Sequence, residues 1–409
     1  MTIQLSDRQR LLNKVASLVQ SKHFNPVLHL VDWLALVESR RERILSALND
    51  DDFEHEVNDL VRQLKTSHTG FVHRRSRRIP ARNAINATFQ RWIVDGSEYW
   101  MFQDVHPGGP AYAAGVQPGD VLLRVGDRCL KPPEQPEFGV GGNTSITIRK
   151  RNGTTIRVPL HLPGPKSKQV PISTPQPVLF TTLQNRIGYL KVSTFPGVVG
   201  IDVATDIDRA IESFKDCDKL IIDLRGNTGG GVGGLRLMGY LTPSQLEVGY
   251  SLTRRRAERG YAKEQLTRFG KIPKHKRSLL WLVLRYALVE KSIVVVTEGL
   301  GPRSFHGRIV ILVNEHTASA AEMIAAFAEE NSLATVVGKN TAGRLLSGRP
   351  FKVGDGYILW LPVAQYLTWS GKLIEGVGVA PHIEVSLVPE ALLKGRDTQL
   401  EKALELLRD

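Results

Sequence analysis

Hydrophobic positions in the first 66 residues recur at the three- and four-residue spacing of helices. They include Leu11, Leu12, Val15, Leu18 and Val19, then Val31, Leu34 and Val37. This spacing gathers apolar side chains on one face of a helix. Asn49, Asp50 and Asp51 can cap a further helix over residues 53–64. The pattern predicts an N-terminal helical domain over residues 1–80, whose helical periodicity ends before an Arg-rich stretch.

The pattern then changes to short runs typical of β-strands, which extend to residue 162. These runs cover residues 87–94, 98–105, 121–125, 144–150 and 154–160. Residues 108–127, GGPAYAAGVQPGDVLLRVGD, contain a turn, a short Ala-rich helix ended by a glycine, and a Pro-Gly-Asp turn before a buried strand. We therefore expect a β-domain over residues 81–162. The Pro-rich and polar residues 163–178 are typical of a linker.

Strand-like and helix-like runs alternate in the remaining part of the chain, residues 179–409. Strands are predicted at 187–192, 219–224, 308–313 and 334–338, and helices at 202–214 and 320–330. Such alternation is typical of an α/β sheet with crossover helices. Residues around 245–305 interrupt it, and we interpret them as a basic insertion.

Composition adds that the protein is globular and has few cysteines. The chain has 409 residues, 42% of them hydrophobic and 23% charged, which suits several packed domains. Cys129 and Cys217 are too few for a disulfide framework or a cysteine-ligated zinc site. The first twenty residues lack the apolar core of a signal peptide, so we expect a cytoplasmic protein. We expect no membrane span in residues 278–300, because charged residues interrupt them.

The net charge of +13 is concentrated in two segments. Residues 251–280 hold ten Lys or Arg and two Glu, and residues 71–94 hold six Arg and no acid. We do not expect nucleic-acid binding, because neither segment shows a nucleic-acid module or interleaved stacking aromatics. The segments are interpreted as solvated basic surface, or as a means of attracting acidic peptides.

Two loops at predicted strand ends have residue types suited to catalysis. Residues 223–231, DLRGNTGGG, could form an oxyanion hole, a phosphate cradle or a plain glycine turn. The phosphate interpretation is weakened because no GxxxxGK[ST] pattern occurs here. Residues 313–323, VNEHTASAAEM, place Ser319 at a helix start, where backbone amides would stabilise an anion. The alternative is that Ser319 only caps that helix.

Further motifs complete a family resemblance. GKNTAGR at 338–344 and IEGVGVAP at 374–381 accompany GYLKVSTF at 188–195 and the glycine loop. Together they resemble the S41 peptidases, which include the C-terminal processing and tricorn-core-like proteases, and residues 108–127 closely resemble PDZ domains. The resemblance implies an α/β multidomain protein: N-terminal helices, a PDZ domain that is β-barrel-like, and a crotonase-like (ClpP/crotonase) protease core.

The resemblance also implies which residues act. The nucleophile of the family falls on Ser319 in the TASA segment. Processing proteases pair that serine with a lysine twenty-five residues later, but this chain has Arg344 there, which cannot act as a base. The tricorn-like branch instead uses Ser, His and Glu with a second Ser, which match His68, Glu375 and Ser67.

In that scheme His68 takes the proton of Ser319, and Glu375 orients the imidazole through Ser67. The oxyanion hole would consist of backbone amides, those of Ala320 and of Gly229, or of Gly230 instead. Other interpretations stay open: His68 as a helix cap and Glu375 as a surface residue. His316 is expected to be loop structure, Lys339 is a weak substitute amine, and His382 stands where the family has Asp.

The implied function is that of a serine endopeptidase that cleaves extended or unfolded polypeptides through an acyl-enzyme, with no metal or cofactor. The PDZ domain would dock or gate the substrate by strand addition. A glycine-hydrophobic-glycine carboxylate loop is not evident before residues 100–104. Two alternatives remain: a catalytically inactive S41-like protein that acts as a PDZ-based peptide-binding module, and a nucleic-acid-associated protein binding through residues 254–256. The sequence also leaves a homo-oligomer open.

Overall fold

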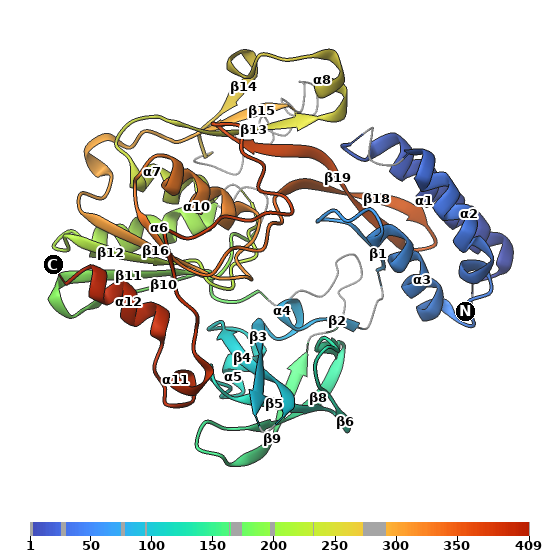
Figure 1. Ribbon diagram of the computed structural model, residues 1–409, viewed down its shortest axis with the longest axis horizontal. Coiled ribbons are helices and arrows are strands. Elements are labelled where there is room, and N and C mark those ends of the chain that lie inside the picture. The colour runs from blue at the N-terminus through green and yellow to red at the C-terminus, as the bar shows by residue number, and fades with distance from the viewer. Residues whose placement is uncertain are drawn as a thin grey trace.

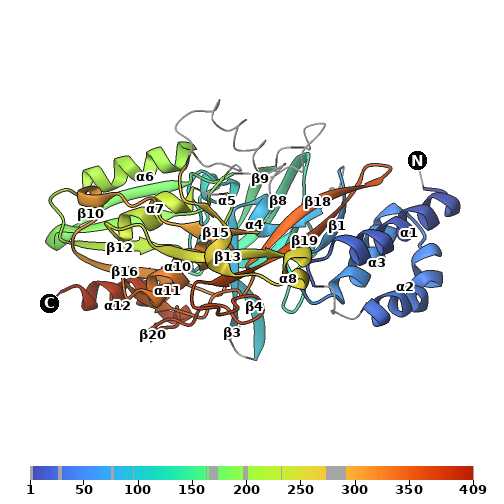
Figure 2. The same ribbon diagram turned by 90° about the horizontal axis from the view of Figure 1, so that it is seen from above.

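The computed structural model describes residues 3–25, 30–74, 78–94, 96–162, 164, 174–196, 201–231, 233–272 and 292–408. Figure 1 shows an α/β body on one side, the N-terminal helices on the other, and a small β-domain below and between them. Figure 2 shows the same order from above, with the N-terminal helices at one end and the C-terminal helix at the other.

A six-stranded sheet forms the centre of the α/β body. Its order is β10 (Val178–Leu183), β11 (Ile187–Val192), β12 (Lys219–Asp223), β16 (Arg308–Val313), β17 (Thr335–Gly338) and β20 (Ile383–Glu384). β10 is antiparallel to β11, and the other pairs are parallel. The central strands are continuous apolar runs because both faces of a parallel sheet are covered. Ile221, Ile222 and Leu312 accordingly have no exposed surface.

Helices cover both faces of this sheet. α6 (Ile201–Ser213), α7 (Gly234–Leu241) and α10 (Ala320–Glu330) pack into one cluster with Ile222 and Ile311. α12 (Thr398–Leu406), which follows the short α11 (Pro389–Leu393), packs on the opposite side against Ile221 and Leu312. The alternation of strand side chains between the two clusters is what a two-period strand requires. The expected α/β core is therefore confirmed.

A second sheet, which the sequence analysis did not anticipate, connects the body to the N-terminal helices. Its order is β1 (Gly70–His73), β19 (Tyr357–Thr368), β13 (Glu247–Thr253), β15 (Ile293–Val296) and β14 (Thr267–Phe269), with β18 (Leu346–Gly354) also paired to β19. The β18–β19 hairpin extends from the body to the helices (Figure 1). The helix α8 (Arg254–Arg259) follows β13.

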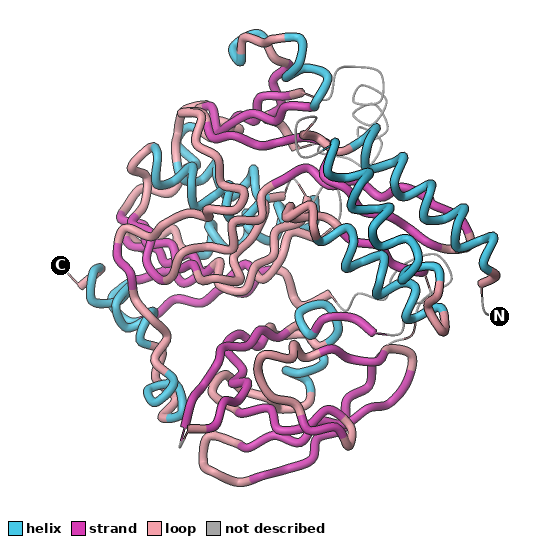
Figure 3. The backbone as a smooth tube through the Cα atoms, turned by 45° about the vertical axis from the view of Figure 1, so that its right-hand side comes forward, coloured by secondary structure: helices cyan, strands magenta, loops and turns pink. Residues whose placement is uncertain are grey.

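The N-terminal helices share one core with this hairpin. α1 (Leu5–Lys22), α2 (Leu30–Leu45) and α3 (Asp50–Arg62) lie along it, as Figure 3 shows in the helix colour. Phe71 and Tyr357 stack with their ring centroids 4.7 Å apart, and both are buried. β1 pairs antiparallel with β19 at this point. The turn between α3 and β1 is therefore fixed against the edge of the core.

The β-domain has the strands expected for residues 81–162. β3 (Ala87–Val94), β4 (Ser97–Val105), β5 (Val121–Val125), β8 (Gly142–Arg149) and β9 (Thr155–Leu162) form its sheet, with β6 (Arg128–Cys129) at the edge and α5 (Pro110–Ala113) before β5. The helix α4 (Ala81–Ala84) joins β2 (Arg78–Pro80) to β3, and β2 pairs with β7 (Glu137–Gly139).

Some expectations fall outside the described residues. These include residues 165–173 of the expected linker and residues 273–291 of the basic and apolar segments. Within the part of the chain that the structure describes, no helix combines the length and hydropathy that a bilayer crossing needs.

Candidate active site

Ser67, His68 and Glu375 form a hydrogen-bonded chain. The Ser67 hydroxyl donates to Glu375 Oε2 at 2.8 Å, and the Ser67 amide donates to Oε1 at 2.7 Å. Ser67 Oγ also lies 2.8 Å from His68 Nδ1. A hydroxyl has one proton, so an Oγ that donates to the carboxylate must accept from Nδ1–H. The neutral imidazole then carries its lone pair on Nε2, where it can accept a proton.

Local backbone geometry fixes this chain. Ser67 and His68 lie in the turn between α3 and β1, and His68 has a positive φ of 58°. A Cβ at Gly348 of β18 would lie 2.9 Å from the Cβ of His68, so the strand passes directly against this residue. Glu375 follows the buried Ile374, and it also accepts from the Leu345 amide at 2.9 Å. Three donors therefore hold its carboxylate.

Ser319 occupies a strained position at the start of α10. Its φ of 57° and ψ of −122° lie outside the regions that a serine normally adopts. Its amide donates to Glu322 Oε2 at 2.9 Å. A Cβ at Gly229 would lie 2.6 Å from the Cβ of Ser319, so the glycine loop and the nucleophile loop touch. Only glycine at position 229 permits this approach.

Glu322 is a site residue that sequence reasoning missed. It is fully buried and accepts from the Ser319, Gly343 and Arg344 amides and from the Thr341 hydroxyl. Burial raises the pKa of Glu322, while these hydrogen bonds act in the opposite direction. The available signal was the Ser-x-x-Glu spacing of a capping box, which predicts a helix start and no more.

The segment of Arg344 and Leu345 joins the two halves of the site. The Arg344 amide donates to Glu322, which holds Ser319, at 2.9 Å. The next amide, that of Leu345, donates to Glu375, which holds Ser67. Two carboxylates, one from α10 and one from the loop after Ile374, are therefore held by consecutive backbone amides. These bonds connect the residues around Ser319 to the chain of Ser67, His68 and Glu375.

The candidate oxyanion donors differ in their availability. The Gly229 amide donates to Asn227 Oδ1 at 2.8 Å, so it is engaged within the loop. Gly230 forms a parallel bridge with Phe195. The amides that make the hydrogen bonds of this bridge belong to neighbouring residues and not to Gly230. Ala320 is the first residue of α10, where an amide has no acceptor within its own helix. Of the two glycines that the sequence analysis proposed, Gly229 has its amide bonded to Asn227, whereas the Gly230 amide does not make that bond.

The electrostatic environment of His68 favours its neutral form. Burial lowers the pKa of His68 below the ordinary histidine value, and the positive charges of Arg344 and Arg82 lower it further. Arg82 belongs to α4, and Arg344 lies between β17 and β18. A histidine held in its neutral form is available as a base at neutral pH.

The remaining titratable candidates have other partners. His316 Nε2 lies 3.0 Å from the carbonyl of Phe89, in β3. Lys339 pairs with Glu384 at 2.7 Å, and His382 Nδ1 accepts from the amide of Val336. These contacts hold loops and strand ends in place and do not involve Ser67 or His68.

The β-domain contacts the segment before Ser319 through polar side chains. Asp104 of β4 accepts from the side-chain amide of Asn314 at 2.9 Å and from the hydroxyl of Thr88 at 2.6 Å. The neighbouring Gln103 donates to Glu315 at 3.2 Å. Asn314 and Glu315 both belong to the segment before Ser319. A movement of the β-domain would therefore shift that segment.

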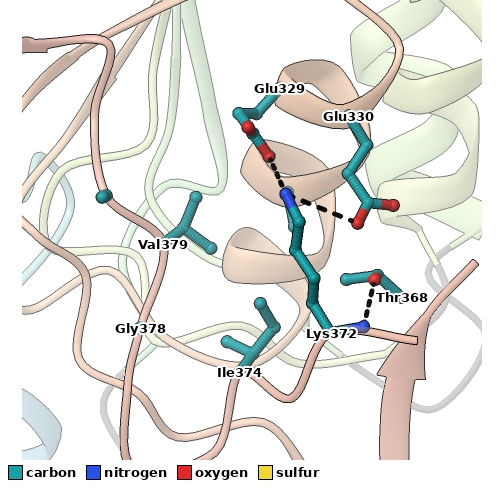
Figure 4. A pocket seen from close by; sticks show the side chains of 9 residues that line it. Glu329, Glu330, Thr368, Lys372, Ile374, Gly378 and Val379 are labelled. Carbon is teal, nitrogen blue, oxygen red and sulfur yellow. Dashed lines mark hydrogen bonds and ion pairs between the residues drawn. The ribbon is translucent and has the colours of Figure 1, made fainter. Parts of the chain in front are cut away.

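A pocket lies beside Ile374, Gly378 and Val379, as Figure 4 shows. It is lined by α10, by the end of β19 and by the segment around Ile374 and Val379. Lys372 lies 3.3 Å from Glu329 and 3.9 Å from Glu330, so its charge is already neutralised. The pocket borders the segment from Ile374 to Val379. Ser67 and His68 do not line it.

Comparison with known proteins assigns two parts of the chain. Residues 186–385 match the sequence profile of Peptidase family S41, and residues 101–136 match that of the PDZ domain. Tricorn protease homolog 2 of Streptomyces coelicolor is 24% identical over 422 residues, which cover 96% of this chain and 32% of that protein. Carboxy-terminal processing protease CtpA of Bacillus subtilis is 26% identical over 294 residues, covering 70% of this chain and 53% of that protein.

Solved structures share the fold. The photosystem II D1 C-terminal processing protease has a TM-score of 0.58 at 18% identity, and the match covers 98% of this chain and 97% of that one. Mature CPAF has a TM-score of 0.59 at 17% identity, covering 98% and 96%. The chain spans only about a third to a half of the two curated relatives named above.

Proposed function

This chain contains a peptidase domain of family S41 and a PDZ domain, and we propose that it is a serine endopeptidase that cleaves extended polypeptides through an acyl-enzyme. The observation that supports this most is the hydrogen-bonded chain from His68 through Ser67 to Glu375. In this chain His68 would be a neutral base whose orientation is fixed by Ser67 and Glu375. Arg344 stands where the alternative serine–lysine mechanism would need its lysine, and the substitute amine, Lys339, is paired with Glu384.

In the proposed reaction Ser319 Oγ attacks the scissile carbonyl carbon while His68 Nε2 takes the hydroxyl proton. The amides of Gly230 and Ala320 hold the oxyanion. The C–N bond then breaks, and His68 returns the proton to the leaving amine, which leaves an acyl ester on Ser319. His68 takes a proton from water, which attacks that ester. The ester bond to Ser319 Oγ breaks, His68 returns the proton to Oγ, and the new C-terminus is released. Throughout, Ser67 and Glu375 keep Nδ1–H oriented.

The PDZ domain is proposed to dock the polypeptide and to influence the site. Strand addition to a PDZ sheet binds main chain and demands little of its sequence. The contact from Asp104 to Asn314 supports a route by which docking affects the loop of Ser319. The polypeptide would be held extended at the PDZ domain while a neighbouring segment enters the site.

A fluorophosphonate probe tests the nucleophile. We expect covalent labelling of the wild-type protein, loss of labelling in Ser319→Ala, and strongly slowed labelling in His68→Ala. Ser213→Ala, at the end of α6, is the matched control and should label normally. The same proteins are incubated with a peptide library and the products are read by mass spectrometry. Labelling without His68 dependence would contradict the proposed base.

The competing function is that of an inactive peptide-binding module. It is favoured if the wild-type protein is neither labelled nor cuts any peptide, yet retains library peptides through the PDZ domain. Cleavage that Ser319→Ala abolishes would exclude it.

A further inference from the structure

β10 is an outer strand of the central sheet, and one of its two sides is open. Within the described ranges it pairs with β11 on one side and with no strand on the other. In the same part of the chain, the one further hydrogen bond to its main chain is at its first residue, where the side-chain amide of Gln176 donates to the Val178 carbonyl at 3.3 Å. An open strand edge of this kind presents unpaired amides and carbonyls to any strand that approaches it.

The side chains of β10 are suited to a further strand. Its sequence, VLFTTL, consists of apolar and hydroxyl residues and contains neither a charge nor a proline. Uncharged residues with a preference for strands are those that allow an exposed edge to pair. Thr181 and Thr182 are exposed. Phe180 is 43% exposed, although its ring lies edge-on to that of Phe214 with the centroids 6.2 Å apart. A large apolar ring is thus left partly in solvent on this strand.

Other outer strands of this protein carry features that oppose pairing. β18 contains Arg349, Pro350 and Lys352, and β9 contains Arg157 and Pro159. Charges and prolines on an edge prevent a second chain from adding to it. β2, β6, β7, β14 and β20 have only two or three residues each, which is too short for a stable strand pair.

Two longer outer strands are protected in other ways. Asn58 and Glu54 of α3 make hydrogen bonds to the main chain of β1 at Phe71 and His73, so a helix covers that edge. β3 carries Arg91 in its middle. Among the outer strands that the structure describes, β10 therefore stands apart as a strand of six residues without a charge, a proline or a covering helix along its edge.

We propose that β10 pairs antiparallel with β10 of a second copy of this chain, which joins two six-stranded sheets into one. Two copies of the same strand match in length, and each cross-strand pair brings apolar or hydroxyl side chains together, so no like charges meet. Each copy has one such edge. An isologous contact therefore uses both edges and stops at a dimer. This inference is independent of the proposed peptidase activity.

Symmetry limits how the two strands can meet. Directly opposite residues of an antiparallel pair point to the same face, and a two-fold axis perpendicular to the sheet keeps each face on its own side. One residue must therefore lie opposite its own copy. Near the middle of the strand that residue is Phe180 or Thr181. In the first case the two Phe180 rings meet, and in the second Phe180 lies opposite Thr182 of the other copy. Both arrangements cover the exposed ring.

The small size of this edge predicts a reversible dimer. A standard stable interface buries roughly 800 Å² per partner and uses about 20 to 30 residues a side. β10 supplies six residues, to which the neighbouring side chains of the sheet faces add. We therefore expect a dissociation constant in the micromolar range rather than a permanent assembly.

Sedimentation equilibrium of the full chain tests the pairing. The wild-type protein is expected to pass from monomer to dimer between about 1 and about 100 micromolar. Thr182→Lys should weaken the dimer by about tenfold or more, because the pairing would take the lysine charge out of water. Thr155→Lys, the same change at an exposed position of the outer strand β9, is the control and should keep the wild-type constant. A far-UV circular dichroism spectrum like that of the wild type shows that each variant is folded.

Two outcomes of this measurement would overturn the proposal. One is a wild-type protein that stays monomeric over the whole range, which leaves the edge to a different partner or to none. The other is a dimer that Thr182→Lys does not weaken, which must use another surface.

Cysteine cross-linking tests the arrangement of the strands. Phe180→Cys and Thr181→Cys are made in a Cys129→Ser background, because Cys129 is exposed, and are treated with a short bismaleimide. We expect a cross-linked dimer from at least one of them, since one of these positions lies opposite its own copy. The background protein and Thr155→Cys should give none. Absence of cross-linking in both variants, at concentrations where the wild-type protein is dimeric, would contradict antiparallel pairing through β10.

Discussion

The hydroxyl of Ser67 donates a 2.8 Å hydrogen bond to Glu375, which lies 308 residues later in the chain. The bond exists because β1 adds to the edge of β19 and so carries the preceding turn into the core. Its chemical effect is to fix which nitrogen of His68 holds the proton. The proposed base and the carboxylate proposed to orient it thus come from distant parts of the sequence.

Ser67→Ala should impair catalysis without unfolding the protein. It removes the acceptor of Nδ1–H, so the imidazole loses its fixed tautomer and orientation, and we expect kcat/KM to fall by about 100-fold or more. The measurement is peptide cleavage together with the rate of fluorophosphonate labelling. An unchanged melting temperature shows that the fold persists. Normal labelling of Ser319 in this variant would contradict a role for Ser67.

Arg344→Gln should move the acid limb of the pH profile upward. Burial and the two arginine charges depress the pKa of His68, so its neutral, basic form persists to lower pH than usual. Activity requires that form and is lost as pH falls through the pKa. Removing the positive charge of Arg344 reduces the repulsion on the protonated His68 ring and so raises the pKa of His68. The profile of kcat/KM against pH measures this, and an unshifted or lowered limb would be inconsistent with the coupling.

Glu322→Gln should destabilise the protein and the loop of Ser319. An amide has one acceptor oxygen where the carboxylate has two, so some of the four buried donors lose their partner, at a cost of about 2 kcal/mol. Urea unfolding measures this. Glu329→Gln on the same helix, where the partner is the partly exposed Lys372, should cost less than about 1 kcal/mol. Equal effects in both would contradict the assignment.

Asp104→Ala should loosen the connection between the PDZ domain and the nucleophile loop. It leaves the side-chain amide of Asn314 and the hydroxyl of Thr88 buried without this acceptor, which costs about 2 kcal/mol. Hydrogen exchange should increase in residues 313–319. Asp127→Ala is the control, because the Asp127 side chain is exposed and pairs with that of Arg157 across 3.3 Å. Unchanged protection of the loop in Asp104→Ala would show that the contact does not couple the two parts.

Strands and helices of the PDZ domain and of the α/β body were predictable where the apolar periodicity is regular. The predicted strands 87–94, 121–125, 187–192 and 308–313 and the helix 320–330 coincide with β3, β5, β11, β16 and α10. The second sheet was not predictable in the same way. β18 contains Gly348, Pro350 and Gly354, and its register shifts twice against β19, so neither propensity nor alternation is regular there.

The candidate site was predictable only where a motif marks it. Ser319, His68, Ser67 and Glu375 lie in recognisable segments, and the structure brings the last three into one hydrogen-bonded chain. Arg82 lies in no motif, and its place beside His68 depends on how α4 folds against the PDZ domain. Glu322 looks like an ordinary capping residue because the loop at residues 341–344, which it also holds, is remote in sequence.

The pairing of β1 with β19 has a consequence for how this protein is made. Ser67 and His68 are translated before the strand that pairs with β1 and before Glu375, which accepts from Ser67. A chain synthesised only as far as Ser319 therefore lacks the hydrogen-bonded chain of Ser67, His68 and Glu375. Under the proposed function, we expect no cleavage by a nascent chain before residue 375 has been synthesised.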